Sequence, residues 1–146
     1  MRVGGVVLLF MMPELSTYHL APVHGRSMEP TLVDGQTVCF RELSATWYQP
    51  VRGDIVVFSA PTEPGRRYVK RLVGLPGDEL RFEGGSLLVN GSKLELPSSA
   101  VDRDLVLSVK VPNDSFYALG DHAAVSWDSR QLGPVSMDKL IGPLVF

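Results

Sequence analysis

Short hydrophobic runs recur along the chain, and glycine, proline, asparagine and aspartate residues separate them. Runs of this kind, rich in β-branched residues, are typical of β-strands, and no stretch has the sustained period of a long helix. The pattern predicts strands at residues 37–41, 54–59, 67–75, 79–82, 86–89, 105–111, 116–119 and 141–146. Many short strands at regular spacing predict an all-β fold, built as a sandwich or a barrel.

A β-hairpin is expected near the middle of the chain. Residues 87–94 place two short runs around Asn90-Gly91, a dipeptide that type I′ turns prefer. Residues 81–110 are more polar than the segments that flank them, so we expect a small inserted β subdomain there. Residues 21–80 and 111–146 would then form one β core.

The first 20 residues form an apolar N-terminal segment, in which Arg2 precedes an uncharged run that ends at Pro13. A helix needs about 20 apolar residues to cross a bilayer, and this run has roughly half that number. Three interpretations stay open: a residual membrane anchor, a patch that dips into one leaflet, or a buried first strand. A bare apolar terminus favours a membrane surface as a partner.

Composition narrows the range of functions. With 146 residues, 45% of them hydrophobic and 21% charged, the chain fits one folded globular domain. A formal net charge of −2 provides no basic field, so we expect no nucleic-acid partner. Cys39 is the only cysteine and excludes an internal disulfide. His19, His24 and His122 match no ligand spacing, so we expect no metal and no cofactor.

Two segments carry candidate chemistry. Ser27 stands in a short loop, and Lys70 stands in an apolar run where strand alternation places it on one face with Leu72 and Gly74. If that face is buried, the pKa of Lys70 falls, and a largely neutral amine near pH 7 can accept the proton of a serine. The alternative from periodicity alone is that Lys70 and Arg71 are surface charges on an edge strand.

A third segment crowds hydroxyl, carboxylate and guanidinium groups into one loop. Asp128 and Arg130 can form a charge-assisted pair, and Ser126 or Ser129 can then hold a neutral lysine by a hydrogen bond. Taken alone, the same residues also suit a turn stabilised by aspartate and serine contacts.

Together these segments resemble the type I signal peptidases, the Ser/Lys-dyad enzymes that remove leader peptides from exported preproteins. The resemblance runs from about residue 23 to residue 146. It rests on blocks in a fixed order, at 27–32 (SMEPTL), 52–58 (RGDIVVF), 69–78 (VKRLVGLPGD), 120–126 (GDHAAVS), 128–130 (DSR) and 133–135 (GPV).

The resemblance implies catalytic roles. Ser27 would be the nucleophile that forms an acyl-enzyme, and its backbone N–H would donate to the oxyanion. Lys70 would be the general base, Ser126 would orient it, and Asp128 with Arg130 would brace the loop.

Two positions depart from the family pattern. Gly25 stands where some members have a hydroxyl that donates to the oxyanion, although other members also have glycine there. His122 and Ala123 replace the usual asparagine and arginine, which puts the salt bridges of that loop in doubt.

The resemblance also implies how substrate binds. A preprotein signal peptide would add as an extended strand beside residues 20–24 and Val69, with small residues in the pattern Ala-x-Ala entering shallow pockets. The expected substrate-binding residues are Pro22, Val23, Gly25, Met28 and Val69. The catalytic face would lie on the extracytoplasmic side of the cytoplasmic membrane, although a soluble form is possible.

Four other functions are compatible with parts of the sequence. A dedicated maturation protease of one partner, such as nickel superoxide dismutase, fits the short chain. Self-cleaving SOS-type regulators also have the serine and a distant lysine. They lack sequences equivalent to the blocks at 128–130 (DSR) and 75–78 (LPGD) of this chain. A His-assisted serine protease would need His24 or His122 beside Ser27. A non-catalytic β module for binding is the fourth.

Overall fold

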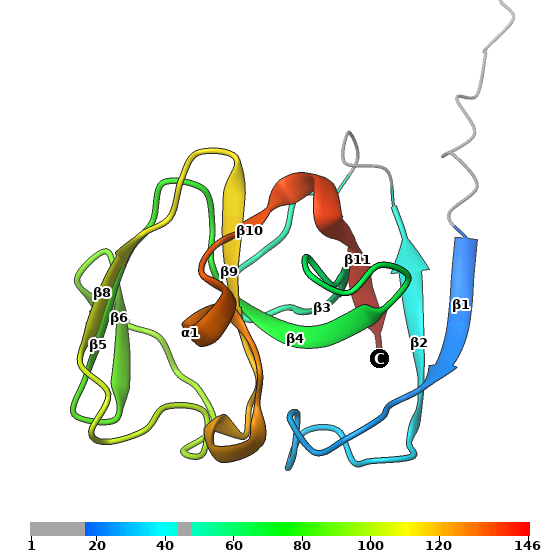
Figure 1. The fold of residues 1–146 in the computed structure, drawn as a ribbon, viewed down its shortest axis with the longest axis horizontal. Coiled ribbons are helices and arrows are strands. Elements are labelled where there is room, and N and C mark those ends of the chain that lie inside the picture. Colours follow the sequence, from blue (N-terminus) through cyan, green and yellow to red (C-terminus); the bar gives the residue numbers. More distant parts are fainter. Residues whose placement is uncertain (1–16, 44–47) are drawn as a thin grey trace, which may run out of the picture.

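The computed structural model describes residues 17–43 and 48–146, and within them the chain forms two antiparallel sheets (Figure 1). The larger sheet has the order β1-β2-β11-β3-β4-β9-β10 and the smaller has the order β7-β6-β5-β8. The larger sheet consists of β1 (Thr17–Pro22), β2 (Thr37–Glu42), β3 (Ile55–Ser59), β4 (Arg67–Gly74), β9 (Ser115–Leu119), β10 (Val135–Ser136) and β11 (Leu140–Val145). The smaller sheet consists of β5 (Glu79–Glu83), β6 (Ser86–Val89), β7 (Ser92–Lys93) and β8 (Leu107–Lys110).

Helical structure is limited to three short pieces among the described residues. They are the 3₁₀ turns Ala123–Val125 and Met137–Lys139 and the α-helix α1 (Ser129–Leu132). No helix in this part of the chain has the length and apolarity needed to cross a bilayer. The predicted all-β class is therefore confirmed. The expected apolar run that ends at Pro13 lies outside the described residues.

The strands agree with the hydrophobic pattern to within one or two residues at most ends. The predicted hairpin is present as β6 and β7, and Asn90 (φ 51°) and Gly91 (φ 86°) both have the positive φ that a type I′ turn requires. Strand β1 begins earlier than the strand expected near residues 20–24, and the two-residue β10 was not predicted. A pair of residues carries no readable alternation, which explains the second omission.

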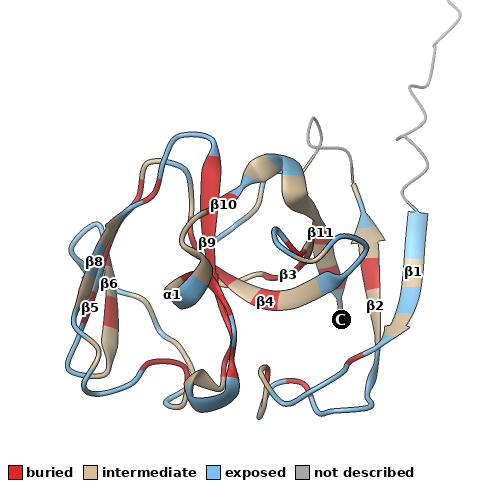
Figure 2. Cartoon of the chain, viewed as in Figure 1, coloured by how far each residue is buried: buried red, intermediate tan, exposed pale blue. Residues whose placement is uncertain are grey.

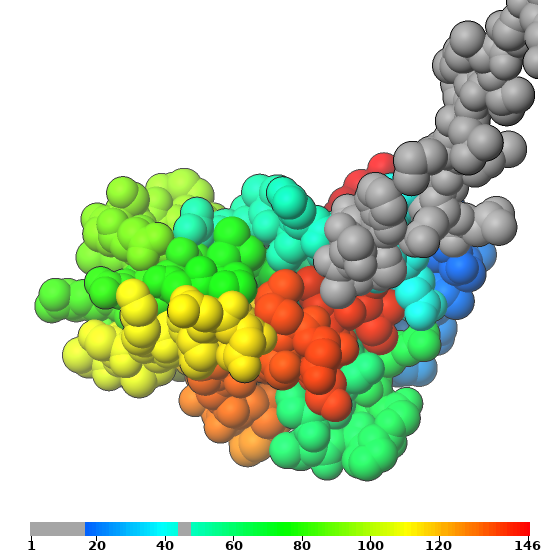
Figure 3. Space-filling view, turned by 90° about the horizontal axis from the view of Figure 1, so that it is seen from above, coloured from blue at the N-terminus to red at the C-terminus, as the bar shows by residue number. Residues whose placement is uncertain are grey.

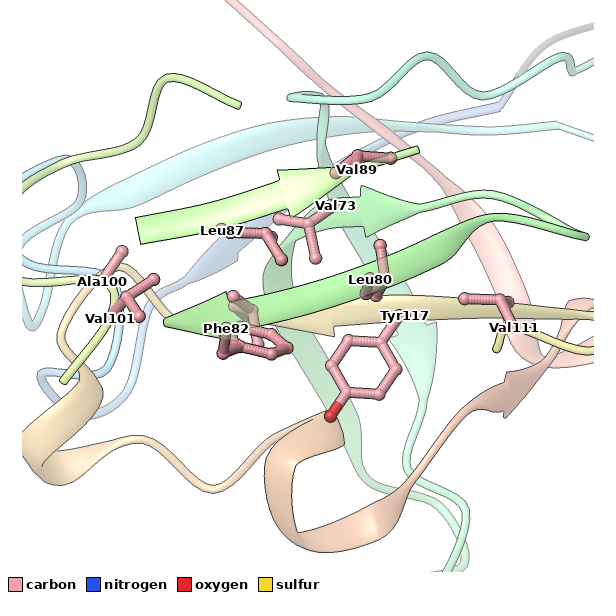
Figure 4. Packing of buried hydrophobic residues seen from close by; sticks show 10 residues of the cluster. Val73, Leu80, Phe82, Leu87, Val89, Ala100, Val101, Val111 and Tyr117 are labelled. Atoms are coloured by element: carbon pink, nitrogen blue, oxygen red, sulfur yellow. The ribbon is translucent and has the colours of Figure 1, made fainter. Parts of the chain in front are cut away.

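The smaller sheet packs on one end of the larger sheet through a shared apolar cluster. Val73 of β4 and Tyr117 of β9 meet Leu80, Phe82 and Leu87 of the smaller sheet, and all five side chains are buried (Figure 4). Seen from above, residues of the smaller sheet gather at one end of the molecule and β1 lies at the other (Figure 3). We propose that this smaller sheet is the inserted subdomain expected at residues 81–110.

An ion pair fixes the junction between the sheets. Arg52 donates from Nε and Nη2 to the two carboxylate oxygens of Asp78, at 2.7 and 2.6 Å. Leu75 and Asn90 donate to the same carboxylate. Desolvation raises the pKa of Asp78, but these donors more than offset it and hold the pKa below its usual value. Because the carboxylate is satisfied on every side, the turn after β4 has a defined geometry.

Two further clusters support the two faces of the larger sheet. One places Met28 and Leu32 of the loop after β1 against Phe40, Ile55 and Val57. The other consists of the buried side chains of Val56, Phe58, Leu72, Phe116, Ala118 and Val135. Strands β3 and β9 are buried along nearly their whole length, whereas β1 is largely exposed (Figure 2). The rigid centre of the fold is therefore the strand pair on either side of β4.

Candidate active site

Backbone hydrogen bonds join the two ends of the loop that carries Ser27, and two of its side chains pack into the core. Val23 and Gln36 are joined by a backbone hydrogen bond of 2.8 Å, and Gly35 donates to Val23 at 2.8 Å. Met28 and Leu32, each 1% exposed, hold the loop to the core. Gly25 has a φ of +88°, which favours glycine because other side chains are strained there. Ser27 is thus presented by a supported turn.

Lys70 reaches that serine from β4. It pairs across the sheet with Val56, is 5% exposed, and its Nζ lies 2.7 Å from the Ser27 Oγ. The strand register buries the face of β4 that carries Lys70 and Leu72; the alternation grouped these residues on one face but did not decide whether that face is buried. Lys70 is therefore no surface charge.

The protonation of Lys70 reflects this burial. Desolvation lowers the pKa of Lys70 to about 8; the Asp128 carboxylate opposes the shift, and Arg130 and Arg66 add to it. At pH 7 a group with this pKa is neutral in about one molecule in ten. The sequence predicted a lowered pKa only if the face of Lys70 is buried; the face is buried and the pKa is lowered, but to a value at which the amine is not largely neutral at pH 7.

An aromatic ring lies beside the amine. Lys70 Nζ is 5.5 Å from the centroid of the Tyr68 ring, and the Tyr68 hydroxyl donates to Glu63 at 3.2 Å. Arg66 lies over the same ring, with its Cζ 5.8 Å from the centroid. A ring face attracts a cation, so Tyr68 favours the charged amine and partly opposes the effect of burial.

The loop after β9 is organised by Asp128. Arg130 donates to both Asp128 oxygens, from Nε at 3.0 Å and from Nη2 at 2.6 Å, and the Ser126 hydroxyl donates to Asp128 Oδ2 at 2.5 Å. Asp128 also caps α1 in a capping box with Gln131. Burial raises the pKa of Asp128, but Arg130, Ser126 and the Gly120 N–H together hold it below its usual value.

The structure thus brings Ser126, Asp128 and Arg130 together, but with a different hydrogen bond from the one expected. The Ser126 hydroxyl binds the Asp128 carboxylate and not the lysine amine. Ser129, the other serine considered for that role, accepts from the Ala118 N–H at 3.0 Å. The carboxylate of a neighbouring residue is a stronger acceptor than an amine, which accounts for the difference.

Gly120 connects this loop to the nucleophile. A Cβ at residue 120 would lie 2.1 Å from the Ser126 Oγ and 2.6 Å from the Ser27 carbonyl oxygen. The Ser27 carbonyl also accepts a hydrogen bond of 2.9 Å from the His122 N–H. Two loops far apart in the sequence therefore touch directly at the serine, and only glycine fits between them.

A second ion pair, which sequence reasoning missed, lies behind the dyad. Arg71 donates to both Asp121 oxygens at 2.8 and 2.7 Å, and the Thr31 hydroxyl donates to Asp121 Oδ2 at 2.5 Å. Asp121 is 0% exposed. The pair ties β4, the Gly120 loop and the Ser27 loop together. The available signal was that all three residues fall within the matched blocks.

A cleft of about 960 Å³ opens at the dyad. Of the expected substrate-binding residues, Pro22, Val23, Gly25 and Val69 line it together with Ser27 and Lys70. Met28 does not line the cleft; it is buried in the cluster below the loop. Packing against Leu32 and Phe40, which the sequence does not reveal, explains its position.

The histidines take other positions. His19 Nε2 lies 2.7 Å from Glu42 and its ring stacks on Phe40, while His24 lines the cleft. No group of three or more histidine, cysteine, aspartate or glutamate side chains in the described part of the chain is arranged to hold a metal ion. The residue whose side chain contacts the Ser27 hydroxyl is Lys70.

Known proteins share this architecture. A family model described as "Signal peptidase, peptidase S26" matches residues 1–146. The probable signal peptidase I-2 of Synechocystis sp. is 38% identical over 123 residues, which cover 80% of this chain and 56% of that protein. Signal peptidase I of Bacillus caldolyticus is 34% identical over 139 residues, covering 85% of this chain and 75% of that protein.

A solved structure has a similar fold. A signal peptidase I from Enterococcus faecalis V583 matches with a TM-score of 0.59 at 29% identity, covering 67% of this chain and 98% of that one. The expected signal-peptidase-like β core is thereby confirmed. The chain spans little more than half the length of the Synechocystis relative. Because the family model covers the chain from end to end, this protein belongs to the signal peptidase family, peptidase S26.

Proposed function

We propose that the protein is a serine endopeptidase that removes N-terminal signal peptides from exported preproteins, using Ser27 as nucleophile and Lys70 as general base. The observation that carries the proposal is the 2.7 Å contact between the Lys70 amine and the Ser27 hydroxyl, made by a lysine that is 5% exposed. A buried lysine in reach of a serine is the arrangement that a Ser/Lys mechanism requires.

The reaction would proceed through an acyl-enzyme. The neutral Lys70 amine takes the Ser27 proton as Oγ attacks the scissile carbonyl, and the resulting ammonium then protonates the leaving amine. A water molecule, deprotonated by the same lysine, hydrolyses the ester. The Ser27 backbone N–H would donate to the oxyanion, an interaction typically worth about 3 kcal/mol.

The surrounding loop would hold the dyad in place. Asp128 carries a negative charge near Lys70, is itself paired with Arg130, and receives the Ser126 hydroxyl. We assign Ser126 a positioning role through Asp128, which differs from a direct contact with the lysine. Gly120 supports this role because its backbone separates Ser126 from the Ser27 carbonyl.

The substrate would bind as an extended strand along β4. Strand β4 pairs with β3 from Arg67 to Arg71 but with β9 only from Arg71 onward, so one edge of residues 67–70 has no strand partner in the described structure. That edge faces the cleft, whose apolar lining includes Val23, Phe40 and Val69. Pockets of this kind suit small side chains, which supports cleavage after an Ala-x-Ala sequence.

A membrane surface and an extracytoplasmic location of the catalytic face remain part of the proposal, with residues 1–20 as the contact. The family to which the chain belongs supports it. Comparing vesicle binding of the full chain with that of a chain lacking residues 1–16 tests it, since equal binding by both would exclude the terminus as the contact.

Cleavage of a leader peptide tests the function. A peptide with an Ala-x-Ala junction should be cut after the second alanine by the wild type, and Ser27→Ala and Lys70→Ala should each abolish cleavage while circular dichroism stays unchanged. Lys93→Ala, which removes an exposed lysine of the smaller sheet, is the matched control. Cutting by either dyad variant contradicts the mechanism.

The alternative of a protease dedicated to one partner is separated by substrate range. A general signal peptidase cuts several unrelated leader junctions at similar rates, whereas a maturation protease cuts only its partner. A self-cleaving regulator would instead cut its own chain, which mass spectrometry of the purified protein detects.

A further inference from the structure

Three arginines line the cleft, and two of them form ion pairs with neighbouring glutamates. Arg26 pairs with Glu29 at 3.0 Å, and Arg66 pairs with Glu63 at 3.0 Å. Arg67 also lines the cleft, but it has no carboxylate at ion-pair distance within residues 17–43 and 48–146. Of these three arginines, Arg67 is therefore the one whose charge stays available to a ligand.

Arg67 lies over an aromatic ring of the cleft. It is the first residue of β4 and is exposed, and its Cζ lies 5.7 Å from the centroid of the buried Phe40 ring. Alternation along β4 places Arg67 on the same face as Val69 and opposite to Lys70. Phe40 and Val69 both line the cleft, so Arg67 extends the apolar wall with a cation.

The position of Arg67 relative to the dyad determines which substrate residue it meets. Arg67 precedes Lys70 by three residues, which is about 10 Å along a strand. Figure 1 shows this end of β4 reaching toward β2, on the side away from the smaller sheet. Val38 and Phe40 of β2 contribute apolar lining to the cleft on this side, so we expect the half of the substrate that carries the small residues to lie here.

In an extended peptide, side chains alternate between two faces. The small residues of an Ala-x-Ala junction stand first and third before the cleaved bond, so they share a face with the fifth residue. Along the wall from the dyad, Val69 comes first and Arg67 follows two residues later. By distance alone the fourth residue before the bond lies nearest Arg67, but it faces away from this wall. The fifth residue, one step further along the strand, faces the wall within reach of the long arginine side chain, so it is the one placed to meet Arg67.

We propose that Arg67 is a specificity-determining residue that selects substrates with an acidic side chain at the fifth position before the cleaved bond. The inference rests on the proposed function, because it takes the occupant of the cleft to be an extended leader peptide. A substrate carboxylate at the fifth position would meet the guanidinium of Arg67, which has no ion-pair partner among the described residues. The Phe40 ring partly shields this guanidinium from water, and a guanidinium can bind a carboxylate through two parallel hydrogen bonds.

Matched peptides test the proposal. Two leader peptides differ only in glutamate or glutamine at the fifth position, and a second pair carries the same change at the fourth position, which faces the other side. The wild type should favour glutamate at the fifth position by about three- to five-fold in kcat/KM, with little preference at the fourth. The preference should shrink in 1 M salt because salt screens exposed charges.

Variants then assign the effect. The ratio of kcat/KM for the glutamate peptide to that for the glutamine peptide should fall to about one in Arg67→Gln and below one in Arg67→Glu. A third peptide, with lysine at the fifth position, should be the best substrate of Arg67→Glu. Arg81→Gln removes an exposed arginine of the smaller sheet, far from the cleft, and should keep the wild-type ratio. Equal rates with the two wild-type peptides, an unchanged ratio in Arg67→Gln, or an equal effect at the fourth position would overturn the proposal.

Its failure is distinguishable from failure of the proposed function. Binding of the same fluorescent peptides to Ser27→Ala reports the charge preference without any cleavage. If the wild type cuts neither peptide, the protease assignment falls; if both peptides are cut and bound equally, only the role of Arg67 falls.

Discussion

Replacing Lys70 by methionine should make the protein more stable at neutral pH while it destroys activity. The structure gives the magnitude: burial lowers the pKa of Lys70 from 10.5 to about 8. Each pKa unit corresponds to about 1.4 kcal/mol, so the charged lysine destabilises the fold by about 3 kcal/mol below pH 8. Losing the hydrogen bond to the Ser27 Oγ costs about 1 kcal/mol, which leaves a net gain of about 2 kcal/mol.

The sign of the pH dependence follows from proton counting. Between the folded pKa near 8 and the unfolded pKa near 10.5, the unfolded chain binds more protons, so wild-type stability rises with pH in this window. The advantage of Lys70→Met should therefore be complete below pH 8 and lost by about pH 10.5.

Urea unfolding at pH 6.5 and at pH 10 measures the advantage, because the midpoint shifts without a change in slope when only stability changes. Lys93→Met, at an exposed position, should change stability by less than about 0.5 kcal/mol at either pH. If Lys70→Met is less stable than the wild type at pH 6.5, or if its advantage does not decline with pH, the lysine is not a desolvated group.

Three further variants probe the supporting contacts. Ser126→Ala removes a hydrogen bond to the Asp128 carboxylate, so it should lower the free energy of unfolding by about 2 kcal/mol and reduce kcat more than it raises KM. The control Ser136→Ala, at an exposed position, should change neither stability nor the kinetic constants. Gly120→Ala should destabilise by at least about 3 kcal/mol in urea unfolding and abolish cleavage, since its Cβ would overlap Ser126; wild-type stability would refute the close approach. Asp78→Asn should lower the free energy of unfolding by about 3 kcal/mol at pH 7, because it removes a buried ion pair with Arg52. The folded-state pKa of Asp78 is lowered, so the stability that the carboxylate contributes is present above the ordinary carboxyl pKa and is lost as pH falls. An equal destabilisation at pH 2 would contradict the ion pair.

The hydrophobic pattern predicted the strands because alternation is a local property. The face of β4 that carries Lys70 could be identified in this way, as could the turn at Asn90-Gly91, where backbone conformation depends on two residues. The position of β11 between β2 and β3 could not, because strand order depends on contacts between residues far apart in the chain.

In the site, too, local features could be predicted from the sequence and contacts between distant residues could not. Residue types at Ser27 and Lys70 suited a dyad, but the contact itself comes from the way β4 and the loop after β1 pack on each other. The hydrogen bond of Ser126 was predicted to the wrong acceptor, since Asp128 is only two residues away and charged. Helix α1 was missed because its four residues show no period, and its stability comes from the Asp128 cap.

The pH dependence of leader-peptide cleavage shows whether Lys70 is the general base. We expect kcat/KM of the wild type to rise about ten-fold per pH unit below pH 7 and to level off above a pKa near 8, because only the neutral Lys70 amine can accept the Ser27 proton. A rate that stays flat from pH 6 to pH 9, or one that still follows this curve in Lys70→Ala, would contradict that role.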